Sequence, residues 1–588
     1  MNLNTINKNS ATLHSQWSHG PTYLYSQIDY ALFLLARDES LSHVNILLHP
    51  VSPLYGLTNI ILILRAHIVR PKSWIKFFYL LGRVWPFKSK SIAKDDIKIN
   101  TTSAIGSSDC KSIYNILSTS SETILLNTRI GTISLARACY WSNFSWFTNY
   151  FVCSLATNKL LASCYVKGRL DLQRLLHLRY NNVLIGDLVC SHALRTWPAS
   201  GGSLEKCNNL ILRAYTFKAV SVCLYIENNF TNFLVNTFVA SPEPTYIHSI
   251  HKRIFHKLGA SVVNSDSLDF RLEILSCEQE LQYPKVKSKG LFDQLRADHI
   301  ALVRQNLEGR ISNKTKLWYM FNGSNQENAD GIFTIDGVLL SLEKTKSCAI
   351  IFLHSFDDGQ YFYGLDSFLD LFEWVTFTID TLIANEACDC VMVKQHPNTC
   401  SGCPGDVVAF NNLLKKYTCQ EKVFFIDPTT NIRNFLHFDS CVGITHHGSV
   451  AEELVYLKIP VIGSFFAPWQ DNYKFLSVWS NKDEYYTLLI ASFSRSCDVS
   501  SFQEKELLRY IYDYRIDVLS IYDSSAWLKY YRLCCNKLIE ITKDNFRLAN
   551  ELFEDMTFND LTNNHFLDYL ASFHELQLKR LGAPIISL

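Results

Sequence analysis

The second half of the chain alternates short apolar runs with segments whose apolar residues recur every three or four positions. The runs predict five strands, at residues 348–355, 391–395, 422–427, 440–445 and 459–464. The segments between them predict helices at residues 366–384, 407–417, 429–438 and 448–458. Because the strand runs show no polar alternation, both faces of the sheet are expected to be covered, as in a parallel sheet. The pattern predicts a doubly wound α/β domain.

An earlier region repeats this alternation more weakly. It predicts strands at residues 123–127, 236–241 and 260–265, with helices at 210–229 and 244–259. We therefore expect two Rossmann-type domains that face a cleft, with extra helical segments at both ends. The expected division is a helical peripheral region (1–104), an N-terminal α/β domain (105–305), a C-terminal α/β domain (306–495) and a helical end (496–588).

Composition narrows the class of protein. The 588 residues carry a net charge of +1, so nothing in the overall charge points to nucleic acid. The N-terminus lacks the apolar core of a signal peptide, and we interpret the 18 cysteines as reduced thiols in the cytoplasm. Residues 57–69 are apolar but too short to span a bilayer, and 70–91 mix aromatic with basic residues. These segments either cover the protein's own core or lie on an anionic membrane surface.

Four cysteines, Cys388, Cys390, Cys400 and Cys403, have a spacing that zinc sites can use. The strand-like segment 391–395 lies between the two pairs. An extended segment of that length separates its ends by roughly 17 Å, much more than two zinc–sulfur bonds allow. We expect packing thiols here and no metal.

Three polar loops follow predicted strands, and the carboxyl ends of parallel strands meet at one edge of a sheet. In the first loop, Asp357 or Asp358 can take a proton from an attacking hydroxyl, although Asp-Gly is also an ordinary turn. In the second, His396 stands before a proline, which restrains its backbone, and Lys394 adds a positive charge. His396 can bond a phosphate or simply be solvated.

The third loop reads GITHHGSVAEE, from residue 443 to 453. It ends a strand and begins a helix, whose first N–H groups and dipole suit an anion. Gly448 would let a phosphate approach the backbone, and Ser449 would cap the helix or bond that phosphate. Glu453 would bond sugar hydroxyls, while a capped helix with exposed acids is the plainer alternative. His446 and His447 diverge from the strand end, so a shared metal ion is not expected.

These loops together resemble the C-terminal domain of GT-B glycosyltransferases. The segment IFLHSFDDGQYFYG (351–364), the motif VKQHPN (393–398) and the segment GSVAEELVYLKIPVIGS (448–464) are similar to bacterial capsule-polysaccharide biosynthesis proteins. That group includes retaining β-Kdo transferases. The set also resembles bacterial sialyltransferases, which use CMP-sialic acid, and teichoic-acid glycerophosphotransferases, which use CDP-glycerol. The chain departs from all three at His446-His447, where a Ser/Thr pair or a Gly pair is more usual.

The resemblance implies a nucleotide-sugar donor, CMP-linked in the nearest groups, and a surface polysaccharide or lipid-linked acceptor. Asp357 or Asp358 would be the base, His396 would be catalytic while holding the donor phosphate with Ser449, and Glu453 would bond the ribose or the base. Lys394, His446, His447 and Gly448 would complete the donor site. No cofactor and no metal is expected. The enzyme would be cytoplasmic, at the inner face of the membrane.

The acceptor side is expected in the N-terminal domain. Glu243, Tyr246 and Arg253 follow the predicted strand at 236–241 and are the candidates. Two alternatives stay open: a glycerophosphotransferase that uses CDP-glycerol, and a polysaccharide-binding or assembly subunit without catalysis.

Overall fold

The computed structural model describes two α/β units and leaves parts of the chain aside. The described residues are 10–16, 43–49, 97–100, 124–127, 132–137, 146–233, 237–240, 249–266, 271–275, 297–312, 332–333, 338, 347–356, 359–361, 363–396, 404–426, 428, 430–438, 440–469, 472–493 and 498–512. The first unit contains the described part of Met1–Val189 and Asn209–Leu281. The second contains that of Cys190–Asn208 and Gln282–Ser524.

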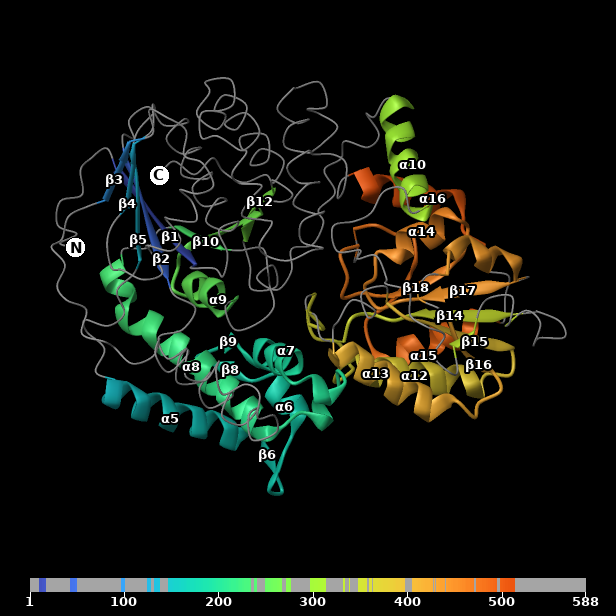
Figure 1. Ribbon diagram of the computed structural model, residues 1–588, viewed down its shortest axis with the longest axis horizontal. Coiled ribbons are helices and arrows are strands. Elements are labelled where there is room, and N and C mark those ends of the chain that lie inside the picture. The colour runs from blue at the N-terminus through green and yellow to red at the C-terminus, as the bar shows by residue number, and fades with distance from the viewer. Residues whose placement is uncertain are drawn as a thin grey trace. The chain divides into compact units, whose positions relative to one another are not determined.

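The second unit is a parallel sheet with helices on both faces (Figure 1). Its strands are β13 (Ile332–Phe333), β14 (Cys348–Phe352), β15 (Cys390–Lys394), β16 (Val423–Ile426), β17 (Cys441–Ile444), β18 (Val461–Ser464) and β19 (Ser477–Trp479). Its helices are α10 (Ala297–Ile311), α12 (Leu371–Ala384), α13 (Pro404–Tyr417), α14 (Val450–Tyr456), α15 (Lys482–Ala491) and α16 (Ser501–Ile511), with a 3₁₀ helix at Ile432–His437.

The strand order in this sheet is β13-β16-β15-β14-β17-β18-β19, and all neighbours are parallel. Counted from β14, this is the 3-2-1-4-5-6 order of a doubly wound fold, with β13 added at one edge. The five strands expected from the apolar runs are confirmed, and so is the doubly wound fold. The order reverses between β14 and β17, where such sheets bind ligands beyond the strand ends.

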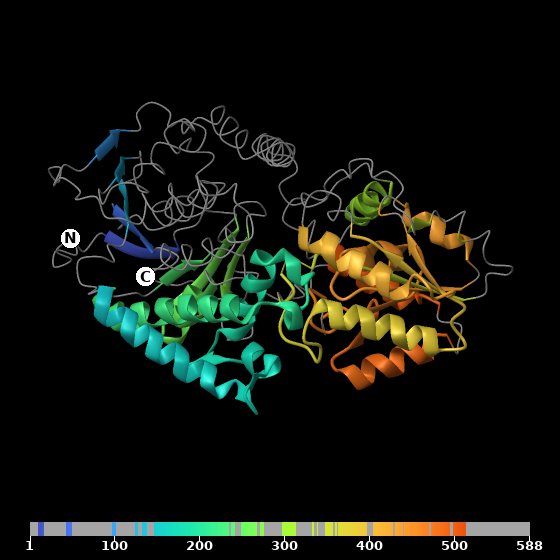
Figure 2. The same cartoon turned by 60° about the horizontal axis from the view of Figure 1, so that its bottom comes forward.

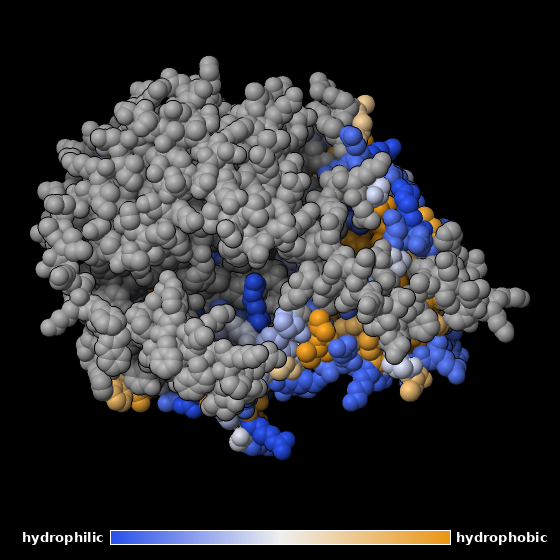
Figure 3. Space-filling model, in the orientation of Figure 1, coloured by the Kyte–Doolittle hydropathy of each residue, from blue (hydrophilic) through white to orange (hydrophobic). Residues whose placement is uncertain are grey.

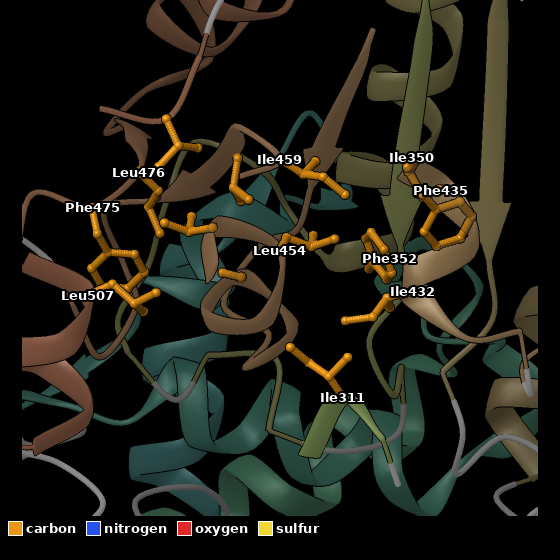
Figure 4. Close-up of a cluster of buried hydrophobic side chains, with 14 of the residues drawn as sticks. Ile311, Ile350, Phe352, Ile432, Phe435, Leu454, Ile459, Phe475, Leu476 and Leu507 are labelled. Atoms are coloured by element: carbon orange, nitrogen blue, oxygen red, sulfur yellow. The ribbon is translucent and has the colours of Figure 1, made fainter. Parts of the chain in front are cut away.

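Two apolar cores cover the two faces of this sheet. On one face, α10, α14 and α16 pack on alternate residues of the strands. Figure 4 shows side chains of this core, with Ile311 of α10 and Leu454 of α14 gathered near Phe352 of β14. On the other face, α12, α13 and α15 bury Trp374 and its neighbours. Strands covered in this way need unbroken apolar runs, which explains the sequence pattern.

The first unit is also built on a sheet. Its strands are β1 (Ser10–Gln16), β2 (His43–His49), β3 (Ile97–Asn100), β4 (Ile124–Asn127), β5 (Thr132–Arg137), β10 (Thr237–Ala240), β11 (Ser261–Asp266) and β12 (Arg271–Leu275). Two short hairpins add β6 (Tyr165–Val166) with β7 (Arg169–Leu170), and β8 (Arg179–Tyr180) with β9 (Val183–Leu184). Its helices are α5 (Trp146–Ser163), α6 (Leu172–Leu176), α7 (Gly186–Thr196), which continues into the second unit, α8 (Asn209–Phe233) and α9 (Ile250–Lys257).

The order of the large sheet is β12-β11-β10-β1-β2-β5-β4-β3. The central strands β11, β10, β1, β2 and β5 are parallel, and their order reverses between β1 and β10. This unit is therefore doubly wound as well. Helices α5 and α8 run side by side in both views (Figures 1 and 2). The helix α9 ends before Gly259, whose φ of 95° suits the expected glycine cap.

The structure corrects the expected division of the chain. Strands β1, β2 and β3 join the large sheet, so residues 1–104 are not a separate helical region. Strand β1 reads SATLHSQ, and its polar residues break the apolar run that predicts a covered strand. Helices α10 and α16 both belong to the second unit, so its boundaries at 305 and 495 move outward. The apolar and basic segment at residues 57–91 lies outside the described residues.

One described helix is long and apolar enough, by length and composition, to cross a membrane. It is α8, over Asn209–Asn228, and 67% of its apolar window is buried inside the protein. The core helix of a globular unit has the same properties.

Candidate active site

The loop after β14 is held firmly on both sides of the predicted carboxylates. Asp406, in the first turn of α13, accepts hydrogen bonds from the Ser355 hydroxyl (2.7 Å) and the Phe356 amide (2.5 Å). Beyond the two aspartates, the Gln360 side chain donates to the Phe356 carbonyl at 2.7 Å. Asp357 and Asp358 themselves lie outside the described residues, so their predicted role stays a prediction.

A segment from earlier in the chain supports this loop. Two 3₁₀ helices, Pro198–Ser200 and Leu204–Lys206, follow α7 and belong to the second unit. Gly202 between them has φ +74°, and a Cβ there would lie 2.4 Å from the Cβ of Phe356. The backbone amide of Leu204 donates to buried Asp370 at 2.8 Å, and burial raises the pKa of that carboxyl to about 6. Only a glycine at position 202 allows the backbone to approach Phe356 this closely.

The turn after β17 is organised around His354, which follows β14. The His447 amide lies 3.2 Å from Nε2 of His354, and the Thr445 hydroxyl lies 3.1 Å from the same nitrogen. A backbone N–H can only donate, so Nε2 of His354 is unprotonated and Nδ1 carries the proton. The Thr445 oxygen also accepts the Gly448 amide at 3.2 Å. Two loops that flank the reversal point are thereby joined.

The structure explains the glycine at position 448 in a different way from the one expected. A Cβ on Gly448 would lie 2.6 Å from the Thr445 hydroxyl and 3.1 Å from the ring of His354. The missing side chain therefore makes room for Thr445 and His354. Close approach of a phosphate to this backbone stays a prediction.

His446 points into the sheet edge and connects two groups. Its Nε2 lies 2.5 Å from Oδ2 of Asp366, and its Nδ1 lies 2.8 Å from Nδ1 of His447. The rings of Trp374 and Trp479 meet it edge-to-face, with centroids 5.5 Å and 5.4 Å away. The imidazole is thus fixed in orientation by packing and by a carboxylate.

His447 is partly exposed, whereas His446 is buried. The His447 ring stacks on that of His354, with centroids 4.1 Å apart and planes 28° apart. The ring of Tyr363 lies beside it, with the two ring centroids 5.3 Å apart. The expected divergence of the adjacent histidines is wrong, because their Nδ1 atoms lie 2.8 Å apart.

Burial sets the charge of these imidazoles. Desolvation lowers the pKa of His354 and His447 well below the usual 6.5, and neighbouring imidazoles add to this. Desolvation and the charge of Lys394 lower the pKa of His396 to about 4. All three rings are neutral at pH 7, because the charged form of each would be poorly solvated there.

Several predicted donor residues are already engaged. The buried Lys394 ammonium donates to the Pro428 carbonyl at 2.5 Å. Ser449 makes no side-chain cap on α14, contrary to one expectation. Glu453 is bonded by Arg310 of α10, with Nη2 at 2.7 Å, and Glu452 bonds the same guanidinium. The expected contact between Glu453 and a donor stays a prediction.

The acceptor candidates lie in the first unit. Arg253 of α9 is 3% exposed and forms a two-pronged pair with Asp187, with both N–O distances at 2.7 Å. Its Nη1 also donates to the Leu184 carbonyl. Both Nη atoms are used inside this unit, so the structure gives no support to the predicted acceptor contact. Glu243 and Tyr246 lie outside the described residues.

Sequence reasoning missed three residues of the site. His354 was missed because the apolar run placed it inside the predicted strand at 348–355, whereas β14 ends at Phe352. Thr445 was missed for the same reason, because the predicted strand at 440–445 contained it and β17 ends at Ile444. Asp366 had no signal, because it reaches His446 across 80 residues. Within the described ranges, no group of three or more His, Cys, Asp or Glu side chains could hold a metal ion.

No protein-family profile and no curated protein matches the chain. Solved structures with similar folds include UDP-GlcNAc 2-epimerases from Methanocaldococcus jannaschii (12% identity, 52% of this chain, 82% of that one, TM-score 0.24) and Neisseria meningitidis (12%, 53%, 82%, 0.25). An α,α-trehalose-phosphate synthase from Burkholderia vietnamiensis is similar over 91% of this chain and 98% of its own (9% identity, TM-score 0.27). TM-scores of 0.24 to 0.27 are too low to assign a function to this chain.

The chain's own strand order and site therefore define its class. It is an α/β protein with two doubly wound units. The second unit has a histidine-rich site at the point where its strand order reverses, which is where folds of this class bind ligands.

Proposed function

We propose that the protein is a GT-B glycosyltransferase that takes its sugar from a nucleotide donor. The observation that carries this proposal is the joining of the β14 and β17 loops at the reversal point of the second sheet, through His354, Thr445 and His447. A second doubly wound unit in the same chain supports it, because such enzymes divide donor and acceptor binding between two domains of this kind.

The roles follow the chemistry of the transfer. A hydroxyl of the acceptor attacks the anomeric carbon, and the nucleotide leaves with the bonding electron pair on its phosphate. His396 and Ser449 are proposed to hold that phosphate, and Asp357 or Asp358 to act as base or to steady the reacting sugar. No step of this scheme calls for a metal ion. The proposed donor is CMP-linked, and the acceptor a surface polysaccharide or glycolipid.

A thermal-shift series tests the donor class. The full chain is heated with CMP, CDP, UDP or GDP. A nucleotide that binds and is present at about 100 times its dissociation constant adds about 2.7 kcal/mol of stability. Stabilisation by one nucleotide, lost in His396→Ala but kept in His177→Ala, is the expected result. His177 is an exposed residue of the first unit. No shift with any nucleotide would overturn the proposal.

A release assay separates the two enzyme hypotheses. CMP release is followed with a CMP-linked keto-sugar acid and, in parallel, with CDP-glycerol. We expect release from the former. Release from CDP-glycerol alone would establish the glycerophosphotransferase instead, and polysaccharide binding without nucleotide binding would establish the non-catalytic subunit.

We also propose that the protein works at an anionic membrane surface, and α5 supports this. One stripe of α5 (Cys153, Thr157, Leu161) is buried against the protein, whereas Phe151 and Leu155 on another stripe are 56% and 69% exposed. Figure 3 shows apolar and hydrophilic side chains beside one another along the lower edge, where Figure 1 places α5 and β6.

The charges around α5 favour an anionic partner. Between Trp146 and Leu176 one acid, Asp171, stands against four exposed basic side chains, which are Lys159, Lys167, Arg169 and Arg174. Apolar side chains beside basic ones suit a membrane interface. Flotation with vesicles of phosphatidylglycerol should exceed that with phosphatidylcholine, and Phe151→Ser with Leu155→Ser should abolish it. Equal binding to both lipids would contradict the proposal.

A further inference from the structure

The three side chains Asp366, His446 and His447 form a continuous hydrogen-bonded chain. A carboxylate only accepts, so Nε2 of His446 donates to Asp366 at 2.5 Å. When His446 is neutral, its Nδ1 then has no proton and must accept from Nδ1 of His447 at 2.8 Å. With its proton on Nδ1, neutral His447 has an unprotonated Nε2.

Adding one proton to this chain changes where the charge lies. If Nε2 of His447 takes a proton, the proton on its Nδ1 can pass to Nδ1 of His446. The positive charge then lies on His446, beside the carboxylate of Asp366, and His447 is again neutral. Asp366 is 10% exposed and His446 6%, so their attraction is little screened by water.

We propose that this chain makes Nε2 of His447 the proton acceptor of the site, with Asp366 and His446 as positioning residues. Of the two roles open to Asp357 or Asp358, the one that remains is to steady the reacting sugar. The inference rests on the proposed function: the acceptor hydroxyl oxygen bonds to the anomeric carbon, the sugar–phosphate bond breaks, and the hydroxyl proton goes to Nε2. The phosphate of the departing nucleotide keeps the electron pair of the broken bond, so atoms and charges balance.

Neighbouring groups keep the imidazole ready for this role. His354 stacks on it from the β14 loop, and its Nε2 is occupied by the His447 amide, so it does not compete for the proton. Tyr363 contacts the ring, and His396 from the β15 loop is close enough to lower its pKa. With Asp366 and His446, these are the titratable groups that face His447 in the described part of the site. A neutral imidazole backed by a carboxylate is the arrangement of a general base.

The substitution Asp366→Asn reverses the polarity of the chain without removing it. The Phe368 amide donates to Oδ1 of Asp366 at 2.7 Å, which keeps the amide oxygen of Asn there. The Asn NH₂ then faces His446 and donates to its Nε2. His446 must carry its proton on Nδ1 and donate to His447, whose remaining proton moves to Nε2.

Chemical modification reads this polarity directly. Diethyl pyrocarbonate reacts with unprotonated imidazole nitrogen, and fragment mass spectra of the full chain separate His447 from His446. We expect His447 to be modified in the wild type at pH 7 and at least about tenfold more slowly in Asp366→Asn, because Nε2 of His447 is then protonated. Asp366→Glu should recover the rate, and Asp380→Asn, which removes an exposed carboxylate of α12, should leave it unchanged.

Equal modification of His447 in folded wild type and Asp366→Asn would overturn the proposal, and so would an unreactive His447 in the wild type. If Asp366→Asn does not fold, long-range ¹H–¹⁵N spectra of the histidine-labelled wild-type chain decide. Nε2 of His447, assigned with His447→Gln, should be the bare nitrogen; a protonated Nε2 would overturn the proposal.

The pH profile of nucleotide release connects the chain to catalysis. In the wild type, kcat should rise with pH as His447 loses its proton, and Asp366→Asn should remove that limb while leaving KM within about twofold. Release with an unaltered profile would refute the catalytic role and keep the glycosyltransferase. The expected modification pattern without release from any nucleotide sugar would refute the glycosyltransferase and keep the hydrogen-bonded chain.

Discussion

Two polar clusters flank helix α14, and they differ in what they leave available. On the side of α10, buried Arg310 binds both Glu452 and Glu453 and also the Ser449 carbonyl. At the sheet edge, Asp366, His446 and His447 form a chain that ends on a ring nearer to solvent. The first cluster satisfies its charges internally, whereas the second ends on the partly exposed ring of His447. Burial alone therefore does not mark a site; the atom left at the end of a network does.

The largest expected effect comes from breaking the cluster on α10. Arg310→Ala leaves two buried carboxylates without their cation, which costs about 3–5 kcal/mol of unfolding free energy. Urea denaturation of the full chain measures it. Arg310→Met combined with Glu452→Leu and Glu453→Leu removes all three charges and should cost much less. An Arg310→Ala chain as stable as the wild type would show that the cluster is not a structural tie.

Removing the outer end of the histidine chain should affect activity and spare stability. We expect His447→Gln to lower kcat by roughly a hundredfold or more, the usual worth of a positioned proton acceptor, measured by nucleotide release. The midpoint of urea unfolding should barely change. His177→Gln, in an exposed position, is the matched control. A loss of stability like that of Arg310→Ala would make the two clusters equivalent.

The histidines at the sheet edge should also make the stability of the protein depend on pH. The folded pKa values of His354, His396 and His447 are lowered, so the unfolded chain binds more protons once the pH falls below about 6.5. Stability is then full above pH 6.5 and is lost down to about pH 4 for His396, by at most about 1.4 kcal/mol per ring per pH unit. Asp370, with a pKa raised to about 6, acts in the opposite direction between its usual 3.8 and 6.

Thermal melts between pH 7 and pH 5 test this sign. The melting temperature should fall on acidification, and His396→Asn should reduce the slope. A melting temperature that rises toward pH 5 would mean that the imidazoles are charged in the folded protein.

The smallest effect is expected at the surface of the same helix, α10. Glu308 pairs with Arg433 at 2.5 Å, but both side chains are nearly half exposed. Arg433→Ala should change the unfolding free energy by no more than about 1 kcal/mol, because water and salt screen such pairs. If Arg433→Ala cost as much unfolding free energy as Arg310→Ala, burial would not explain the difference expected between the two ion pairs.

The sequence predicted the parts of the structure that depend on local pattern. The five strands of the second unit and the loops after β14, β15 and β17 followed from apolar runs and from the rule that parallel strand ends meet. The partners of His446 and Glu453 did not, because Asp366 and Arg310 lie 80 and 143 residues away from them. Strand β1 was missed because its polar residues break the apolar pattern of a covered strand.

The segment Cys190–Asn208 has a consequence for the order in which the chain can fold. It is made early, yet the amide of Leu204 binds Asp370, which lies 166 residues later. At about 5–20 residues per second, a ribosome needs roughly ten to thirty seconds to make that interval. During this time the side chains of the segment cannot yet be buried in the second unit. A C-terminal fragment that begins at Gln282 lacks this piece, and adding the segment as a separate peptide should restore part of its stability.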